Sequence, residues 1–164
     1  MEKINKSILL LKFMVSSISI YFIIMPLESF LIYPIAYQSH FILNLIGYSS
    51  LDGNLINLSN ISIMIVKACT SVTTISILLG FVFSVSKSIK EFIFGGIFCT
   101  GIIYTGNIIR IVITSILANH FGMLSFFHDF VGYISTLILA VITVFAWLKF
   151  QKQLHLKSGK DNVI

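Results

Sequence analysis

Residues 91–118 read EFIFGGIFCTGIIYTGNIIRIVITSILA, an apolar run whose only charged side chains are Glu91 and Arg110. A helix needs about 20 such residues to cross the hydrocarbon core of a bilayer. The run is longer than that, so it predicts a membrane-spanning helix from about Glu91 to Ala118. The rest of the chain is therefore interpreted as part of a membrane protein.

The overall composition leads to the same conclusion. Of the 164 residues, 57% are hydrophobic and 10% are charged, with a mean hydropathy of +0.99. Soluble domains have about 45–50% apolar and about 25% charged residues, and a soluble fold could not hide so much apolar surface. We predict an all-α integral membrane helix bundle that forms one domain over residues 1–164.

Other segments of the chain have the length and hydropathy of spans. With residues 91–118 they make about four transmembrane helices, the others being Ile8–Met25, Cys69–Val85 and Phe130–Leu148. Trp147 at the end of the last span is expected to anchor at the membrane interface. The stretch Phe30–Ile46 is interrupted by Pro34 and by polar side chains, so we expect an interfacial or re-entrant segment there.

A turn signal, Asp52-Gly53-Asn54, lies ahead of the second span. Its flanks, Tyr48–Leu51 and Leu55–Val66, are rich in residues that favour strands. We therefore expect a short extracytoplasmic β-like hairpin on the membrane surface, leading into Cys69.

The basic residues indicate the orientation. With four crossings, nine of the eleven Lys and Arg residues lie on one face: Lys3, Lys6, Lys12, Lys87, Lys90, Lys149, Lys152, Lys157 and Lys160. The positive-inside rule makes that face the cytoplasm. We expect a multi-pass protein of the cell membrane, with both termini and a basic tail (149–164) in the cytoplasm. The net charge of +5 is then explained by the lysines that orient the spans in the membrane, and no nucleic-acid partner is expected.

Arg110 is unusual because it lies inside an apolar helix, where insertion of Arg costs roughly 2.5–3.5 kcal/mol. Asn107, Arg110 and Thr114 share one helix face by their spacing, so that face is expected to point into the bundle. The alternative is that Arg110 extends to the interface from the outer third of the helix.

Cys69 begins the second span, where a helix N-terminus favours a thiolate over a thiol. Lys67 adds positive potential, so Cys69 is a candidate nucleophile; the alternative is a small apolar packing residue. Cys99 lies deeper and is expected to pack. The two cysteines have neither disulfide nor metal-site spacing, and we expect no metal and no cofactor.

His128 precedes the last span at the same outer level. It is a candidate acid or base because imidazole titrates near neutral pH, although an interfacial His can simply be hydrated. Asp129 is a candidate for orienting it, and His40 and His120 are possible substitutes. A thiolate that attacks a carbonyl, an imidazole that moves the proton and a guanidinium that stabilises the oxyanion would together suit acyl transfer.

At these positions the chain resembles the exosortase/archaeosortase family of membrane transpeptidases. The match consists of Ala68-Cys69-Thr70 opening a helix, Asn107-Ile108-Ile109-Arg110-Ile111 inside the next, and His128 before the last. It covers about 47–150, the part similar to a catalytic core. The family commonly has Gly two residues after the nucleophile, where this chain has Ser71.

The resemblance implies a cysteine protease and transpeptidase. Such enzymes recognise a tail-anchored exported protein by a C-terminal signal made of a short motif, a transmembrane helix and a basic tail. By the family pattern Cys69 is the nucleophile that forms a thioester, Arg110 stabilises the intermediate and His128 is the acid or base. The acceptor that resolves the thioester is thought to be a membrane lipid amine in archaeal systems.

Two other classes of function remain open from the residues alone. In a non-enzymatic membrane scaffold or assembly subunit, Arg110 would pair with a partner helix. A thiol-redox enzyme would need Cys69 and Cys99 within reach of each other. A transporter is disfavoured, because one intramembrane charge offers little of a substrate pathway.

Overall fold

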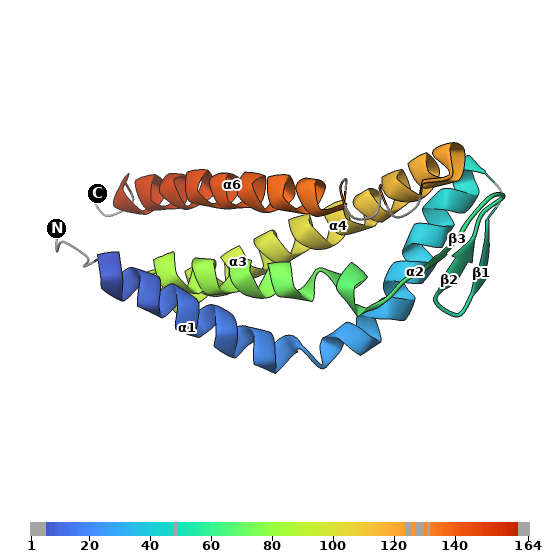
Figure 1. The fold of residues 1–164 in the computed structure, drawn as a ribbon. Coiled ribbons are helices and arrows are strands. Elements are labelled where there is room, and N and C mark those ends of the chain that lie inside the picture. The colour runs from blue at the N-terminus through green and yellow to red at the C-terminus, as the bar shows by residue number, and fades with distance from the viewer. Residues whose placement is uncertain (1–5, 48, 124–125, 127–129, 131, 161–164) are drawn as a thin grey trace.

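The computed structural model describes residues 6–47, 49–123, 126, 130 and 132–160, the last seven as helical backbone only. It is mostly helical with one small sheet (Figure 1). In chain order the elements are α1 (Lys6–Ile24), α2 (Leu27–Ile46), β1 (Ser50–Asp52), β2 (Leu55–Asn57), β3 (Ser62–Met64), the 3-10 turn η1 (Lys67–Thr70), α3 (Val72–Val85), α4 (Ile89–Phe121) and α6 (Gly132–Lys160).

Within the described residues, three helices are long and apolar enough to cross a membrane: α1, α4 and the Gly132–Gln153 part of α6. These agree with three of the four predicted spans. The fourth, α3, is also apolar but has 14 residues. It packs along α1 and against α4, so it belongs to the same bundle as the three longer helices.

The segment expected to be interfacial or re-entrant is one continuous helix, α2, with Pro34 inside it. It has 20 residues but is not among the helices of the described chain that are apolar enough to cross a membrane, in keeping with its polar interruptions. The chain turns at Pro26, and α2 leaves α1 at an angle and runs toward the sheet (Figure 1).

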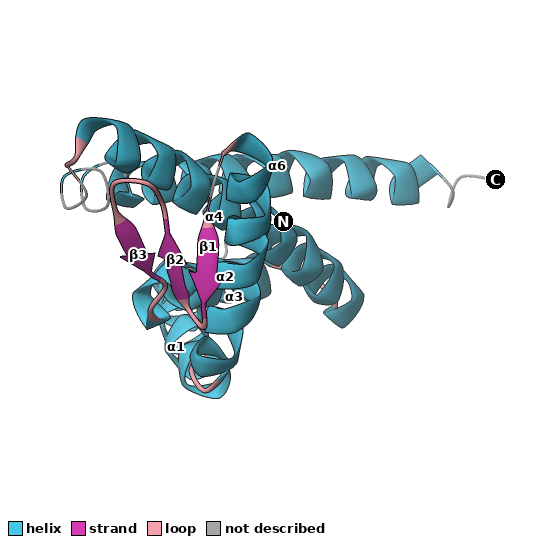
Figure 2. Cartoon of the chain, turned by 90° about the vertical axis from the view of Figure 1, so that its right-hand side faces the viewer, coloured by secondary structure: helices cyan, strands magenta, loops and turns pink. Residues whose placement is uncertain are grey.

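The expected hairpin is present and has a third strand. Its two-residue turn contains Gly53 with φ +60°, between the paired residues Asp52 and Leu55. A left-handed φ is one that glycine adopts without a steric penalty. The sheet is antiparallel in the order β1-β2-β3, and Figure 2 shows its strands beside α2.

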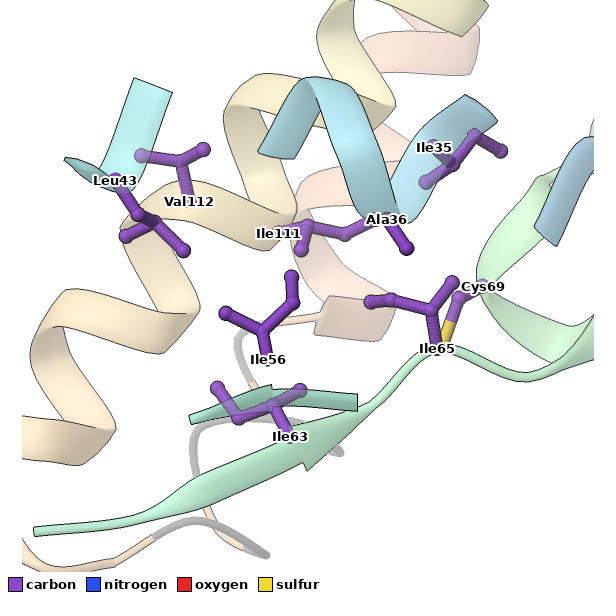
Figure 3. Packing of buried hydrophobic residues seen from close by; sticks show 9 residues of the cluster. All are labelled: Ile35, Ala36, Leu43, Ile56, Ile63, Ile65, Cys69, Ile111 and Val112. Atoms are coloured by element: carbon purple, nitrogen blue, oxygen red, sulfur yellow. The ribbon is translucent and has the colours of Figure 1, made fainter. Parts of the chain in front are cut away.

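The sheet encloses a buried apolar cluster together with α2 and α4 (Figure 3). Ile56 of β2 and Ile63 of β3 contribute from one side of the sheet. The other members are Ile35, Ala36, Leu43, Ile65, Cys69, Ile111 and Val112. Cys69 is thus placed by the packing of the sheet on two helices.

A second cluster lies nearer the chain ends and includes Cys99 and Trp147. Burial of Cys99 confirms the packing role expected for it. The expectation for Trp147 was wrong, because its side chain is fully buried. A Cβ on Gly95 would lie 2.6 Å from the Trp147 ring, so the small residue on α4 makes room for the indole.

One end of the bundle carries most of the described lysines. The start of α1 and the end of α6 lie at that end in Figure 1. Polar contacts join α6 to α4 and α3 there: the amide of Gln151 donates to the carboxylate of Glu91 on α4 at 2.6 Å and to the carbonyl of Val85 on α3 at 3.1 Å. The ammonium of Lys12 lies 5.0 Å from the centre of the Phe83 ring.

Candidate active site

Cys69 lies in η1, the tight turn before α3, and is 4% exposed. Its backbone N–H donates to the carbonyl of Val66 at 2.8 Å. Its own carbonyl accepts a 2.6 Å hydrogen bond from the side-chain amide of Asn107 on α4. The turn that carries the thiol is therefore fixed both locally and from a second helix.

Ser71, two residues after Cys69, has φ +57° and ψ +18°. It is the only residue other than glycine with a positive φ in the described part of the chain. This left-handed backbone costs an L-residue roughly 1–2 kcal/mol, which glycine avoids. Ser71 therefore adopts, at a steric cost, a backbone conformation that is better suited to glycine.

Arg110 lies on α4 and reaches α6. Its Nη1 donates to the carbonyl of Gly132 at 3.3 Å and to the hydroxyl of Thr136 at 3.1 Å. Asn107 and Thr114, on the same helix face, are both buried, which confirms that this face points into the protein. Arg110 itself is half-buried, with hydrogen bonds inside its own chain.

Cys69 and Arg110 line one small pocket with Ile65, Thr114 and Gly132. They are close enough for the charges of a thiolate and the guanidinium to interact. A developing negative charge at Cys69 would therefore have a cation beside it in a largely apolar surrounding, where such an interaction is weakly screened.

The residues around this pocket lie at one level along the bundle. At 1.5 Å per residue, Arg110 is about 30 Å from Lys90, and Gly132 is about 26 Å from Lys149. The end of α1 at Ile24 is about 27 Å from Lys6. The hydrocarbon core is about 30 Å thick, so the pocket is about one membrane thickness away from the lysine-bearing end.

A larger cavity of about 360 Å³ lies on the other side of Arg110 and does not include Cys69 in its lining. Arg110 lines both spaces, and Ala68 and Ser71, on either side of Cys69 and Thr70, line the larger one. Lys67 is the first residue of the turn that carries Cys69; it is exposed and lines the larger cavity but not the small pocket.

Sequence reasoning missed Glu28, which also lines the larger cavity and is 8% exposed. It lies in the first turn of α2, directly after the end of α1. A carboxylate two residues after Pro26, just past the end of a predicted span, was the signal that could have identified it.

His128 and Asp129 lie outside the described residues. Neither suggested substitute lines the Cys69 pocket. The Nδ1 of His40 is hydrogen-bonded to the hydroxyl of Ser49 at 2.9 Å, and His120 lines a separate cavity near Asn119.

Comparisons with known proteins identify similar chains. The family model described as "transmembrane exosortase" matches residues 2–147. A curated protein of Methanocaldococcus jannaschii, named probable archaeosortase E, is 32% identical over 165 residues, covering 99% of this chain and 89% of that protein. No solved structure gives a significant match.

Proposed function

The chain belongs to the transmembrane exosortase family, and on that premise we propose that it is a membrane cysteine protease and transpeptidase. It cleaves the C-terminal sorting signal of exported proteins through a thioester on Cys69 and passes them to an acceptor. The observation that carries the proposal is the pocket shared by Cys69 and Arg110, with the Cys69 turn held by Asn107.

In the proposed reaction the Cys69 thiolate attacks the scissile carbonyl. Arg110 stabilises the oxyanion of the tetrahedral intermediate, as preorganised cations do at sites that exclude water. His128 donates a proton to the leaving amine, with Asp129 as its orienting group, and Lys67 raises the positive potential near the thiol. His128 precedes Gly132, which accepts the hydrogen bond from Arg110, by four residues in the chain.

The substrate of this reaction is a protein held in the same membrane by its own C-terminal helix. The signal consists of a short motif, that helix and a basic tail, and the acceptor is a membrane lipid amine. In this proposal the lysine-bearing end of the bundle is cytoplasmic. The Cys69 pocket, about one membrane thickness away, is then at the extracytoplasmic face, where the segment beside a substrate helix also emerges.

The scaffold alternative predicts that Arg110 pairs with a helix of another protein. Against it, Arg110 donates two hydrogen bonds to α6 of its own chain. The thiol-redox alternative is disfavoured because Cys69 and Cys99 belong to two different buried clusters.

The test is processing of an exported protein from the same genome that carries the three-part C-terminal signal. Cys69→Ala, Arg110→Ala and His128→Ala should each abolish cleavage while the protein accumulates in the membrane. Cys99→Ala and His120→Ala are matched controls that should cleave normally. Normal cleavage by Cys69→Ala would refute the proposal, and dissociation of a complex by Arg110→Ala with no effect of Cys69→Ala would favour a scaffold.

A further inference from the structure

The carboxylate of Glu28 is the feature of the site region that the catalytic roles above do not use. The residue is 92% buried, the complement of its 8% exposure. No hydrogen bond or ion pair to its side chain occurs within the described residues. Its carboxylate oxygens are not among the fully buried side-chain atoms that lack a partner in the described part of the chain, so they are accessible from the cavity that Glu28 lines. A mostly buried acidic side chain at such a cavity favours a ligand that supplies a cation or a proton donor.

The cavity that Glu28 lines is next to the thiol's turn. Its wall includes Ala68 and Ser71 from that turn, and Arg110, which also lines the Cys69 pocket. Helix α2 packs against η1. A small group held in this cavity would therefore approach an acyl group on Cys69 from the side of α2.

The other charged and polar groups around the cavity do not neutralise Glu28. Arg110 is hydrogen-bonded to α6. Lys67 is exposed, and Thr73, Thr74, Tyr133 and Thr136 are neutral. The cavity of about 360 Å³ has room for a small polar head such as an aminoethyl group.

We propose that Glu28 binds the acceptor of the transfer step as a primary ammonium and removes its proton. This inference rests on the proposed function, because it requires a thioester on Cys69. A protonated amine has no free electron pair for attack, whereas a neutral one does. A single carboxylate near the acyl group would therefore have two roles: it would bind the ammonium in preference to neutral molecules, and it would accept the proton that has to leave before the nitrogen can attack.

The ammonium gives one proton to Glu28, and the neutral nitrogen attacks the thioester carbonyl. The new C–N bond forms, the C–S bond breaks, and the second proton moves from nitrogen to the departing Cys69 sulfur. An amide and a free thiol result, and Glu28 releases its proton to water.

The test compares wild type with Glu28→Gln in membranes, using the same exported substrate and two added nucleophiles. Ethanolamine is protonated at neutral pH and needs a base; hydroxylamine is largely unprotonated and does not. With Glu28→Gln we expect the thioester on Cys69 to form and to accumulate. Transfer to ethanolamine should fall on the order of 10²-fold, and release by hydroxylamine should stay unchanged. Asp52→Asn removes an exposed carboxylate and is the matched control.

Equal transfer to ethanolamine by wild type and Glu28→Gln would overturn the inference, as would an equal loss with both nucleophiles. If the glutamine variant does not accumulate, Glu28→Asp takes its place. Its shorter carboxylate should slow transfer to ethanolamine alone, and an unchanged ratio between the two nucleophiles would contradict the proposal. If wild type forms no thioester on Cys69, the proposed function itself has failed, which is a distinguishable result.

Discussion

The side-chain amide of Asn107 donates a 2.6 Å hydrogen bond to the backbone carbonyl of Cys69, joining the middle of α4 to the turn before α3. Both residues are buried. Asn107 lies three residues before Arg110, so one turn of α4 both holds the backbone of the thiol residue and carries the cation beside it. The relative position of Cys69 and Arg110 therefore depends on this contact.

Asn107→Ala should slow formation of the thioester on Cys69 without abolishing it. The variant leaves a buried backbone carbonyl without its donor, which costs about 1–3 kcal/mol of stability, and lets the Cys69 turn move relative to Arg110. Cleavage rates in membranes and thermal unfolding in detergent measure the two effects. Thr105→Ala, an exposed position on the same helix, is the control, and wild-type cleavage by Asn107→Ala would contradict the positioning role.

Arg110→Lys should cleave far more slowly than wild type although it keeps the charge. Both bonds to acceptors on α6 come from Nη1, so the planar guanidinium has further N–H donors for an oxyanion, in a geometry that a compact lysine ammonium cannot reproduce. Thr136→Val, which removes one of these acceptors, should have a smaller effect in the same direction, and Thr136→Ser should have little. If Arg110→Lys retains full activity, charge alone is sufficient and the geometry described here is not required.

Ser71→Gly should stabilise the protein by about 1 kcal/mol, because glycine avoids the steric cost of the left-handed backbone. Ser71→Ala should remain near wild type, and Ser71→Val should be less stable, since a β-branched residue is poorly suited to positive φ. Thermal unfolding in one detergent orders the three variants. A glycine variant no more stable than the alanine variant would show that Ser71 is not strained.

Gly80→Ala should destabilise the bundle because α1 and α3 approach closely at this residue. A Cβ there would lie 2.0 Å from the hydroxyl of Ser17 and 2.7 Å from its backbone, so the helices must separate, at about 1–3 kcal/mol. Gly101→Ala is the matched control, with nothing within 4 Å of its added Cβ. It should be neutral or stabilising by about 0.5–1 kcal/mol. Equal effects of the two changes would argue against the close α1–α3 packing.

Much of the fold could be predicted because membrane spans depend on local composition. The long apolar helices α1, α4 and α6 follow from runs of apolar residues bounded by lysines, and the turn at Gly53 follows from local turn chemistry. The third strand and the path of α2 could not be predicted, since they depend on packing between Ile56, Ile63 and helices distant in sequence. The interface position predicted for Trp147 follows from the general enrichment of Trp at membrane interfaces. That rule contains no information about packing, so it could not reveal the space that Gly95 leaves for the indole.

The site could be predicted in part for the same reason. Cys69 and Arg110 are conspicuous in an apolar chain, and their shared depth follows from counting residues from the lysines. Glu28 could not be placed from its spacing, because its approach to the Cys69 turn depends on the angle between α1 and α2 at Pro26. The hydrogen bond from Asn107 to the backbone carbonyl of Cys69 could not be predicted either. Every residue has such a carbonyl, so the sequence does not indicate which one accepts.

The most direct test of the account is mass spectrometry of the Cys69 peptide from membranes in which the enzyme is processing its substrate. We expect a hydroxylamine-labile thioester that joins Cys69 to the new C-terminus of the cleaved protein, absent from Cys69→Ala and unaltered in Cys99→Ala. Continued cleavage by Cys69→Ala, with no adduct on Cys69 in wild type, would contradict it.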